Sequence, residues 1–204
     1  HMMDSYRRTD NPDALLLTNL DYLQWKRRTD PGFRPYHAPE GRIGLTQDPY
    51  LAALNKLIAE NQSRDICAEV YLLKAQEAVN AGVPASGLQL CDEAISRYPA
   101  YHRINALREL KQDILSPDFT VQTPSAVYPG EEFDLKVSFK NLKSFAVQLY
   151  AINLPVRPNA VEVPDETFLK KYGRLLSSVH YVLFPSGDYK MQDSIFHMKA
   201  PETG

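Results

Sequence analysis

The chain lacks two features that would indicate common classes of function. It carries 23 Lys and Arg against 25 Asp and Glu, a net charge of -2, so it has no surplus of positive charge for phosphate backbones. It has no apolar run near the roughly 20 residues of a membrane-spanning helix, because Leu15–Leu17 is soon followed by Asn19 and Asp21. The sequence therefore predicts neither nucleic acid as a partner nor a membrane-spanning segment in this part of the protein.

Cysteine and glycine are also scarce. The two cysteines, Cys67 and Cys91, lie within predicted helices and not at the spacings of a disulfide framework, so we expect two buried thiols. The 15 prolines outnumber the 9 glycines, which indicates ordered turns more than flexible linkers. With 44% hydrophobic and 24% charged residues, the composition is typical of a folded globular chain and not of a disordered one.

What the sequence does contain is a change of periodicity near its middle. Before Ser116 the apolar residues recur every three or four positions, and after Pro117 they alternate, so a helical pattern gives way to a strand pattern. This predicts an α+β protein with two domains. Residues 1–116 are expected to form an antiparallel helical-repeat domain, and residues 117–204 an antiparallel β-sandwich.

Helix signals in the first half are local. Asp48-Pro49 predicts a helix start, because Asp caps the free N–H groups and Pro lacks one. Gly82 predicts a helix end, and Ser86-x-x-Gln89 is a capping box that opens another helix. In the first helix, Leu16, Leu20, Leu23 and Arg27 fall on one stripe. The predicted helices span residues 13–28, 48–60, 65–81, 88–98 and 101–115.

Strand signals fill the second half. Phe133, Leu135, Val137 and Phe139 alternate with polar residues, which predicts a strand with one buried face. The last two runs are joined by Pro185–Asp188, which we interpret as a hairpin connection. The predicted strands span residues 119–123, 133–139, 146–153, 175–184 and 189–198, with a short turn at 167–172.

A regularly spaced set of residues lies in the third and fourth predicted helices: Tyr71, Ala75, Gly82, Ala94 and Pro99. By type and spacing this set resembles a tetratricopeptide repeat, a helix-turn-helix unit of about 34 residues. Lys74 and Gly87 depart from the pattern, because an apolar residue and an alanine are usual there. A single repeat cannot bury both of its faces, so the helices on either side are expected to act as its neighbours.

In the second half, the segments 127–133 and 135–142, followed later by 188–193 and 198–204, resemble the first macroglobulin-like domain of bacterial alpha-2-macroglobulin-family proteins. This would make the β-sandwich macroglobulin-like, a relative of the immunoglobulin-like sandwiches. The first helices are similar to an N-terminal segment of large envelope proteins of this family from Bacteroides-like bacteria. In such a domain a final strand would follow Pro201-Glu202, so the resemblance implies a missing last strand and an exposed edge.

The family implies a function for the parent protein. Its members are large, often lipid-anchored proteins of the periplasm or cell surface that trap or inhibit proteases. Many carry a Cys-Gly-Glu-Gln thioester, but Cys91-Asp-Glu-Ala94 lacks the glutamine. The resemblance thus implies a non-catalytic scaffold fragment without the reactive centre. Its expected partners are other domains of the same parent protein, and proteases or envelope proteins.

No catalytic, cofactor-binding or metal-binding residue is predicted, and the chain is not expected to be an enzyme. His180 and His197 lie on the two runs of the predicted hairpin and could face each other. Two histidines lack the further ligands of a structural zinc site, so partly exposed strand histidines are the preferred interpretation. A clustered acid, base and nucleophile is also missing from the sequence pattern.

One group of aromatic and basic residues suggests a binding surface around the end of the first helix. Aromatic side chains can anchor a peptide or glycan, and arginines can supply hydrogen bonds. This would make the helical domain an envelope binding module for a partner protein or glycan. The alternative is that the aromatics fold back over the ends of the helices. The residues are Trp25, Arg27, Arg28, Phe33 and Tyr36.

Overall fold

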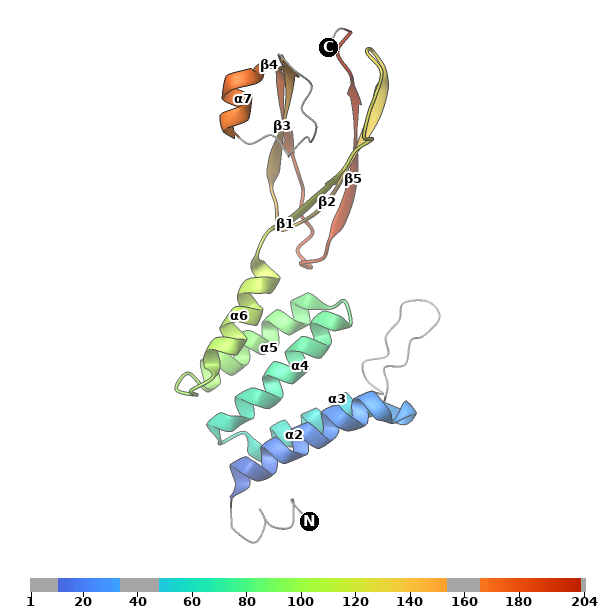
Figure 1. Cartoon of the computed structure of the whole chain (residues 1–204). Coiled ribbons are helices and arrows are strands. Elements are labelled where there is room, and N and C mark those ends of the chain that lie inside the picture. The colour runs from blue at the N-terminus through green and yellow to red at the C-terminus, as the bar shows by residue number, and fades with distance from the viewer. Residues whose placement is uncertain (1–10, 34–47, 154–165, 203–204) are drawn as a thin grey trace. The chain divides into compact units, whose positions relative to one another are not determined.

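The computed structural model describes residues 11–33, 48–153 and 166–202. The chain divides into two compact units, His1–Leu115 and Ser116–Gly204. Helices form the first unit, and antiparallel strands in two small sheets dominate the second (Figure 1). The α+β class predicted from the change of periodicity is therefore confirmed.

The helical unit places successive helices beside one another (Figure 1). The turn between α4 and α5 spans only three residues, so these two helices pack as antiparallel neighbours. The α-helices are α2 (Pro12–Thr29), α3 (Pro49–Asn61), α4 (Ala68–Asn80), α5 (Pro84–Arg97) and α6 (Ile104–Leu115), and the short 3-10 helices are η1 (Pro31–Phe33) and η2 (Asp65–Cys67). No helix among the described residues combines the length and hydropathy that crossing a membrane requires.

Two of the helix signals act as predicted. The Asp48 carboxylate accepts a hydrogen bond of 2.8 Å from the Tyr50 N–H and caps α3. Gly82 has a φ of 72°, in the left-handed region that favours glycine at a helix end.

Two other helix boundaries were predicted wrongly. Helix α5 begins at Pro84, not at Leu88, and its N-cap Val83 makes no side-chain cap bond. Because proline has no N–H to satisfy at the first helical position, this start does not need the predicted capping box. Helix α6 begins at Ile104, not at Tyr101, since Tyr101 lies between the turn residues 99–100 and 102–103 with its side chain buried.

The core of the helical unit is centred on α4. Residues from Cys67 to Leu72 are all buried, and both cysteines are fully buried free thiols, as predicted. Gly87 of α5 lies so close to α4 that an added Cβ would meet Val79 Cγ2 at 2.9 Å and the Ala75 oxygen at 3.1 Å. The departure from the repeat pattern at Gly87 thus corresponds to a close approach of two helix backbones.

The second unit contains a three-stranded sheet in the order β1-β2-β5 and a two-stranded sheet formed by β3 and β4, with all pairs antiparallel. Phe145 of β3 contacts Phe119 of β1 and Phe196 of β5, with ring centroids 5.3 Å and 5.2 Å apart. The two sheets therefore pack on each other. The elements are β1 (Asp118–Gln122), β2 (Glu132–Lys140), β3 (Ser144–Ile152), α7 (Glu166–Tyr172), β4 (Gly173–Val182) and β5 (Gln192–Lys199).

The predicted hairpin between the last two strands is wrong. Strand β4 pairs with β3, whereas β5 pairs with β2, so the connection passes from one sheet to the other. After β4 the Leu183 N–H donates to the Lys143 carbonyl oxygen at 2.8 Å, and the Leu183 side chain is buried in the sheet core. This buried residue holds the chain against β3 before it crosses. His180 and His197 consequently lie in different sheets.

Candidate functional site

The residues predicted to form a recognition surface separate into an outward and an inward group. Trp25 is 54% exposed, and its ring stacks on that of Tyr22, with centroids 6.0 Å apart and planes 27° apart. Arg28 is also exposed. Tyr36 lies outside the described residues. Trp25 and Arg28 therefore remain candidates for contact with a partner.

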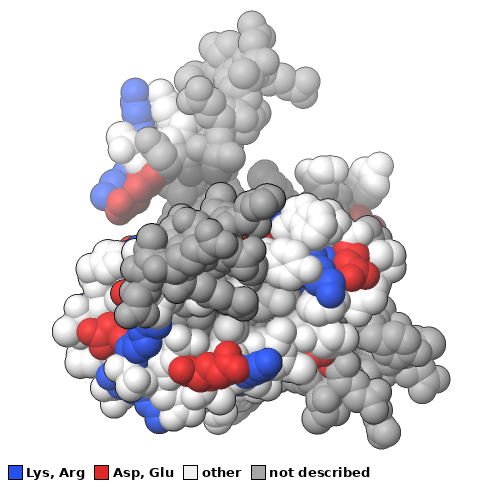
Figure 2. All heavy atoms as spheres, turned by 90° about the horizontal axis from the view of Figure 1, so that it is seen from below, with Lys and Arg blue, Asp and Glu red and all other residues white. Residues whose placement is uncertain are grey.

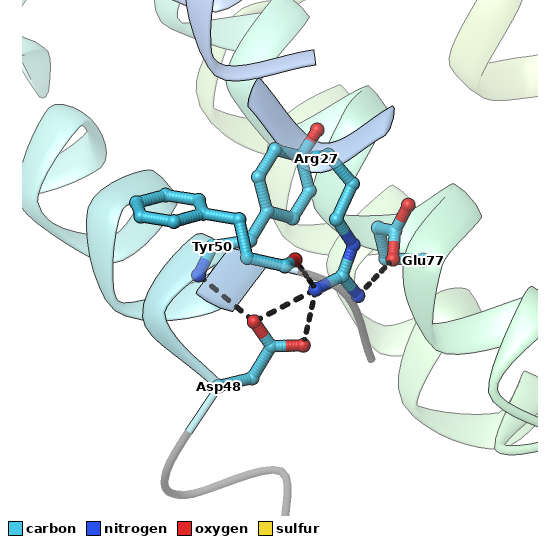
Figure 3. Close-up of polar contacts among 5 residues, drawn as sticks. Arg27, Asp48, Tyr50 and Glu77 are labelled. Atoms are coloured by element: carbon cyan, nitrogen blue, oxygen red, sulfur yellow. Dashed lines mark hydrogen bonds and ion pairs between the residues drawn. The ribbon is translucent and has the colours of Figure 1, made fainter. Parts of the chain in front are cut away.

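Arg27 points inward instead. Its side chain is 11% exposed and its guanidinium donates to the Phe33 carbonyl oxygen at 2.6 Å, to the Asp48 carboxylate at 2.9 Å and to Glu77 Oε2 at 2.9 Å (Figure 3). These acceptors come from η1, from the cap of α3 and from α4. Arg27 thus joins four elements of the helical unit. We call this group, Arg27, Phe33, Asp48, Tyr50 and Glu77, the arginine clamp.

Tyr50 forms one wall of the clamp. The Arg27 guanidinium carbon lies 4.8 Å from the centre of the Tyr50 ring (Figure 3), a favourable cation–π distance. Burial, together with the nearby Glu77 carboxylate, raises the pKa of Tyr50 to about 12, although Arg27 acts in the opposite direction. The phenol therefore stays protonated near neutral pH and cannot act as a base there.

Phe33 also faces the helical core. It is partly buried against that core, and the Lys26 ammonium lies 3.9 Å from the centre of its ring. This agrees with the interpretation in which aromatic residues cover the helix ends.

A small cavity of about 260 Å³ lies beside the clamp. It is lined by Gln24, Arg27, Arg28, Tyr50, Leu73, Gln76, Glu77 and Asn80.

A second polar group was missed in the sequence. Glu69 of α4 is buried, and its carboxylate accepts a hydrogen bond from the Tyr101 hydroxyl at 2.8 Å and forms an ion pair with Arg103 at 3.1 Å. Burial, reinforced by Glu69, raises the pKa of the Tyr101 phenol. Glutamate is rarely buried unless paired, and its partners lie more than 30 residues away in the chain. No local pattern could have indicated this pairing.

Beside this buried group lies a cavity of about 470 Å³ at the α2 and η2 ends of the helical unit. Arg64 and Asp13, which line it, form an ion pair with each other. Two of the charged side chains in its lining are therefore matched with each other. The lining residues are Asp13, Arg64, Asp65, Ile66, Ala100, Tyr101 and His102.

Charges on the visible face of the molecule are mixed. Figure 2 shows Lys and Arg side chains next to Asp and Glu side chains, without a broad basic area among the described residues on that face. Exposed helix residues form pairs such as Lys56 with Glu60. This mixture provides no continuous field for a polyanion on that face.

The histidines of the β unit do not come together. His197 Nδ1 lies 2.7 Å from Asp134 Oδ1 on the exposed face of the three-stranded sheet, whereas His180 lies opposite Ala146 in the other sheet. In the part of the chain that the structure describes, no three His, Cys, Asp or Glu side chains are grouped to hold a metal.

The β unit instead presents large apolar side chains to solvent. Phe184 is 84% exposed, and Val182 and Ile195 are also more than half exposed. They line a cavity of about 360 Å³ together with Phe139 and the start of β5. We call Val182, Phe184 and Ile195 the apolar rim. A contiguous apolar patch of this kind is typical of an interaction surface.

No protein-family model, curated protein or solved structure matches this chain.

Proposed function

We propose that this chain is a non-catalytic scaffold and protein-interaction part of a larger cell-envelope protein of the alpha-2-macroglobulin type. The observation that carries the proposal is the apolar rim, in which large side chains surround a cavity on a unit with a small core. Exposed apolar area is unfavourable by roughly 25 cal/mol per Å². Burial of the rim against a partner would therefore stabilise the complex.

The proposed occupants of the rim are other domains of the same parent protein. The order of helices followed by antiparallel strands supports this, because it matches the start of the family that the sequence resembles. The parent protein would be periplasmic or at the cell surface, lipid-anchored, and would trap proteases. This chain would contribute contacts, while the reaction with a protease would take place elsewhere in the parent.

The state of the thiols supports a non-catalytic part. Burial, with a smaller contribution from Asp92, raises the pKa of Cys91 to about 11, and Cys67 is shifted in the same direction for the same main reason. A nucleophilic cysteine requires an accessible thiolate. Neither cysteine is therefore suited to covalent chemistry.

The proposal can be tested by labelling the rim. We expect Phe184→Cys to react quickly with a thiol reagent in this chain and at least ten times more slowly in the full-length parent protein. Lys56→Cys, at an exposed site of α3, should react equally in both. Equal labelling of Phe184→Cys in both proteins would contradict the proposed coverage.

The coding sequence on both sides of this chain provides an independent test of the family. A lipobox cysteine upstream and a Cys-Gly-Glu-Gln motif downstream are expected. A stop codon directly after Gly204 would rule out the larger parent protein.

A second function is favoured by the stacked Tyr22–Trp25 pair. These exposed rings, near Arg28, would let the helical unit bind a glycan or a partner protein of the envelope. Trp25 is the single tryptophan, so its fluorescence reports on this surface directly. Titration with peptidoglycan fragments should shift the emission, and Tyr22→Ala should weaken the response. An unchanged spectrum with glycans and with isolated envelope proteins would exclude this function.

A further inference from the structure

Strand β1 is an edge strand with apolar side chains that are only half covered. All five of its residues are exposed. Phe119 and Val121 are 40% and 41% exposed, although the residues opposite them on β2, Phe139 and Val137, are buried. The inner face of the three-stranded sheet is thus covered at its centre but not along β1.

A backbone bond between the residue before β2 and the residue after β5 shows which residues of β2 bond to β5 and which bond to β1. The Ala200 N–H donates to the Glu131 carbonyl oxygen at 2.8 Å. Because hydrogen-bonded and non-hydrogen-bonded pairs alternate along antiparallel strands, odd-numbered residues of β2 bond to β5. Even-numbered residues, such as Ser138, consequently bond to β1.

Strand β1 therefore bonds to β2 through Asp118, Thr120 and Gln122, the partners of even-numbered β2 residues. The backbone groups of Phe119 and Val121 then point away from β2, toward the free edge. A separate observation agrees: the Phe119 N–H donates to the Asp118 side chain at 2.8 Å.

The opposite edge of the same sheet is protected. On β5 the positions that point away from β2 include Asp193, His197 and Lys199, and each of these side chains has a polar or charged partner. Charged side chains on an edge disfavour the addition of another strand. On β1 the only charged residue is Asp118, at its first position.

We propose that β1 pairs with β1 of a second copy of this chain, antiparallel and centred on Thr120. Phe119 would then lie opposite Val121 of the second copy, and these residues exchange hydrogen bonds through the groups that point outward. Thr120 faces its own counterpart in a pair without hydrogen bonds. Asp118 lies opposite Gln122 of the second copy. The inference goes beyond the proposed function and does not depend on it.

The match of β1 with itself favours a second copy over an unrelated strand. This register pairs all five residues, and a shift by one residue would place outward groups opposite inward ones. The half-covered Phe119 and Val121 side chains meet each other on the inner face, and no like charges become neighbours on β1. A contact of five residues buries far less surface than the roughly 1,000 Å² of a stable interface. The dimer is therefore weak and depends on concentration, and Asp118 competes with it for the Phe119 N–H.

A disulfide at the centre of the pairing tests the proposal. Directly opposite residues of a pair without hydrogen bonds have Cα atoms about 4.5 Å apart, within the range of a disulfide. Under mild oxidation, Thr120→Cys should form covalent dimers at least ten times faster than Lys136→Cys, an exposed position on β2. The native cysteines are buried and do not interfere. Equal rates for the two variants would overturn the proposal.

A proline substitution in β1 should prevent the proposed pairing and so complements the disulfide test. In the Thr120→Cys background, Val121→Pro removes an outward N–H but no bond to β2, so cross-linking should fall at least tenfold. Val121→Thr keeps the N–H and should leave the rate within about twofold. If circular dichroism shows that the proline variant is unfolded, Val121→Lys replaces it with the same expected loss. Cross-linking unaffected by both the proline and the lysine would refute edge pairing. Protection of Thr120→Cys in the parent protein without dimers would assign the edge to another strand and refute the second copy.

Discussion

The two units differ in how completely they bury their own apolar residues. Among the described residues, the helical core contains 17 buried residues, whereas the sheet core contains four, Leu135, Val137, Phe139 and Leu183. Polar groups in the helical unit are also paired internally, as in the arginine clamp. The β unit leaves Phe184 and Tyr128 largely exposed. This difference indicates that the helical unit is stabilised from within and that the β unit has surface left for contacts.

The largest test of this comparison is the loss of the arginine clamp. Arg27→Ala leaves Asp48 and Glu77 without their cation at a site that is mostly buried. Removing one partner of a buried ion pair typically costs about 3–5 kcal/mol. We expect a loss of that size in the free energy of unfolding of the helical unit, measured by urea denaturation. Arg28→Ala, at an exposed position, should change it by less than about 0.5 kcal/mol.

Helix packing provides the next test. In Gly87→Ala the new Cβ would press on Val79 and on the backbone of α4. Overpacking costs about 1–3 kcal/mol, while the better helix propensity of alanine returns up to about 1 kcal/mol. We expect a net loss of roughly 1–2 kcal/mol in thermal or urea unfolding. The matched control is Gly187→Ala, because no atom lies within 4 Å of its added Cβ. A stabilised Gly87→Ala protein would show that the helices are not tightly packed.

Alkaline pH should lower the stability of the helical unit and so distinguish it from the β unit. The folded state raises the pKa of Cys91 from its ordinary value near 9 to about 11, so the unfolded chain releases this proton first. The free energy of unfolding therefore falls as pH rises from about 9 to 11. A decrease on the order of 1–2 kcal/mol is expected in the helical unit, and Cys91→Ala should reduce it. Stability that is independent of pH in this range would argue against a closed core.

The smallest effect is expected on the exposed face of the three-stranded sheet. The His197–Asp134 pair is exposed on both sides, and exposed pairs contribute about 0–1 kcal/mol. His197→Ala should therefore change the unfolding free energy of the β unit by less than about 1 kcal/mol. A loss above about 2 kcal/mol would mean that this pair belongs to a structural centre of the unit.

Several features of the fold could be predicted because they depend on neighbouring residues. The start of α3 at Asp48 and the turn at Gly82 follow from local hydrogen bonding and backbone conformation. The inward position of Arg27 had a weak signal, since this residue falls on the stripe of Leu16, Leu20 and Leu23. A basic group beside aromatics also suits a surface site, so the pattern alone did not distinguish the two roles.

The predicted hairpin failed for the opposite reason. Both β4 and β5 were predicted as strand runs, but a run of strand-forming residues does not specify the neighbour of a strand. The neighbours were decided by Leu183, which is buried among residues of β2 and whose N–H bonds to Lys143 before β3. The same limit applied to Glu69 and Tyr101, whose bond joins distant parts of the chain.

The sequence by itself determined the α+β class, the positions of most helices and strands, and the burial of both thiols, because periodicity and capping act within a few residues. Tertiary structure decided which strands share a sheet, which direction Arg27 faces and which side of β1 faces away from β2. Each of these depends on residues far apart in the chain, whose approach no local pattern records.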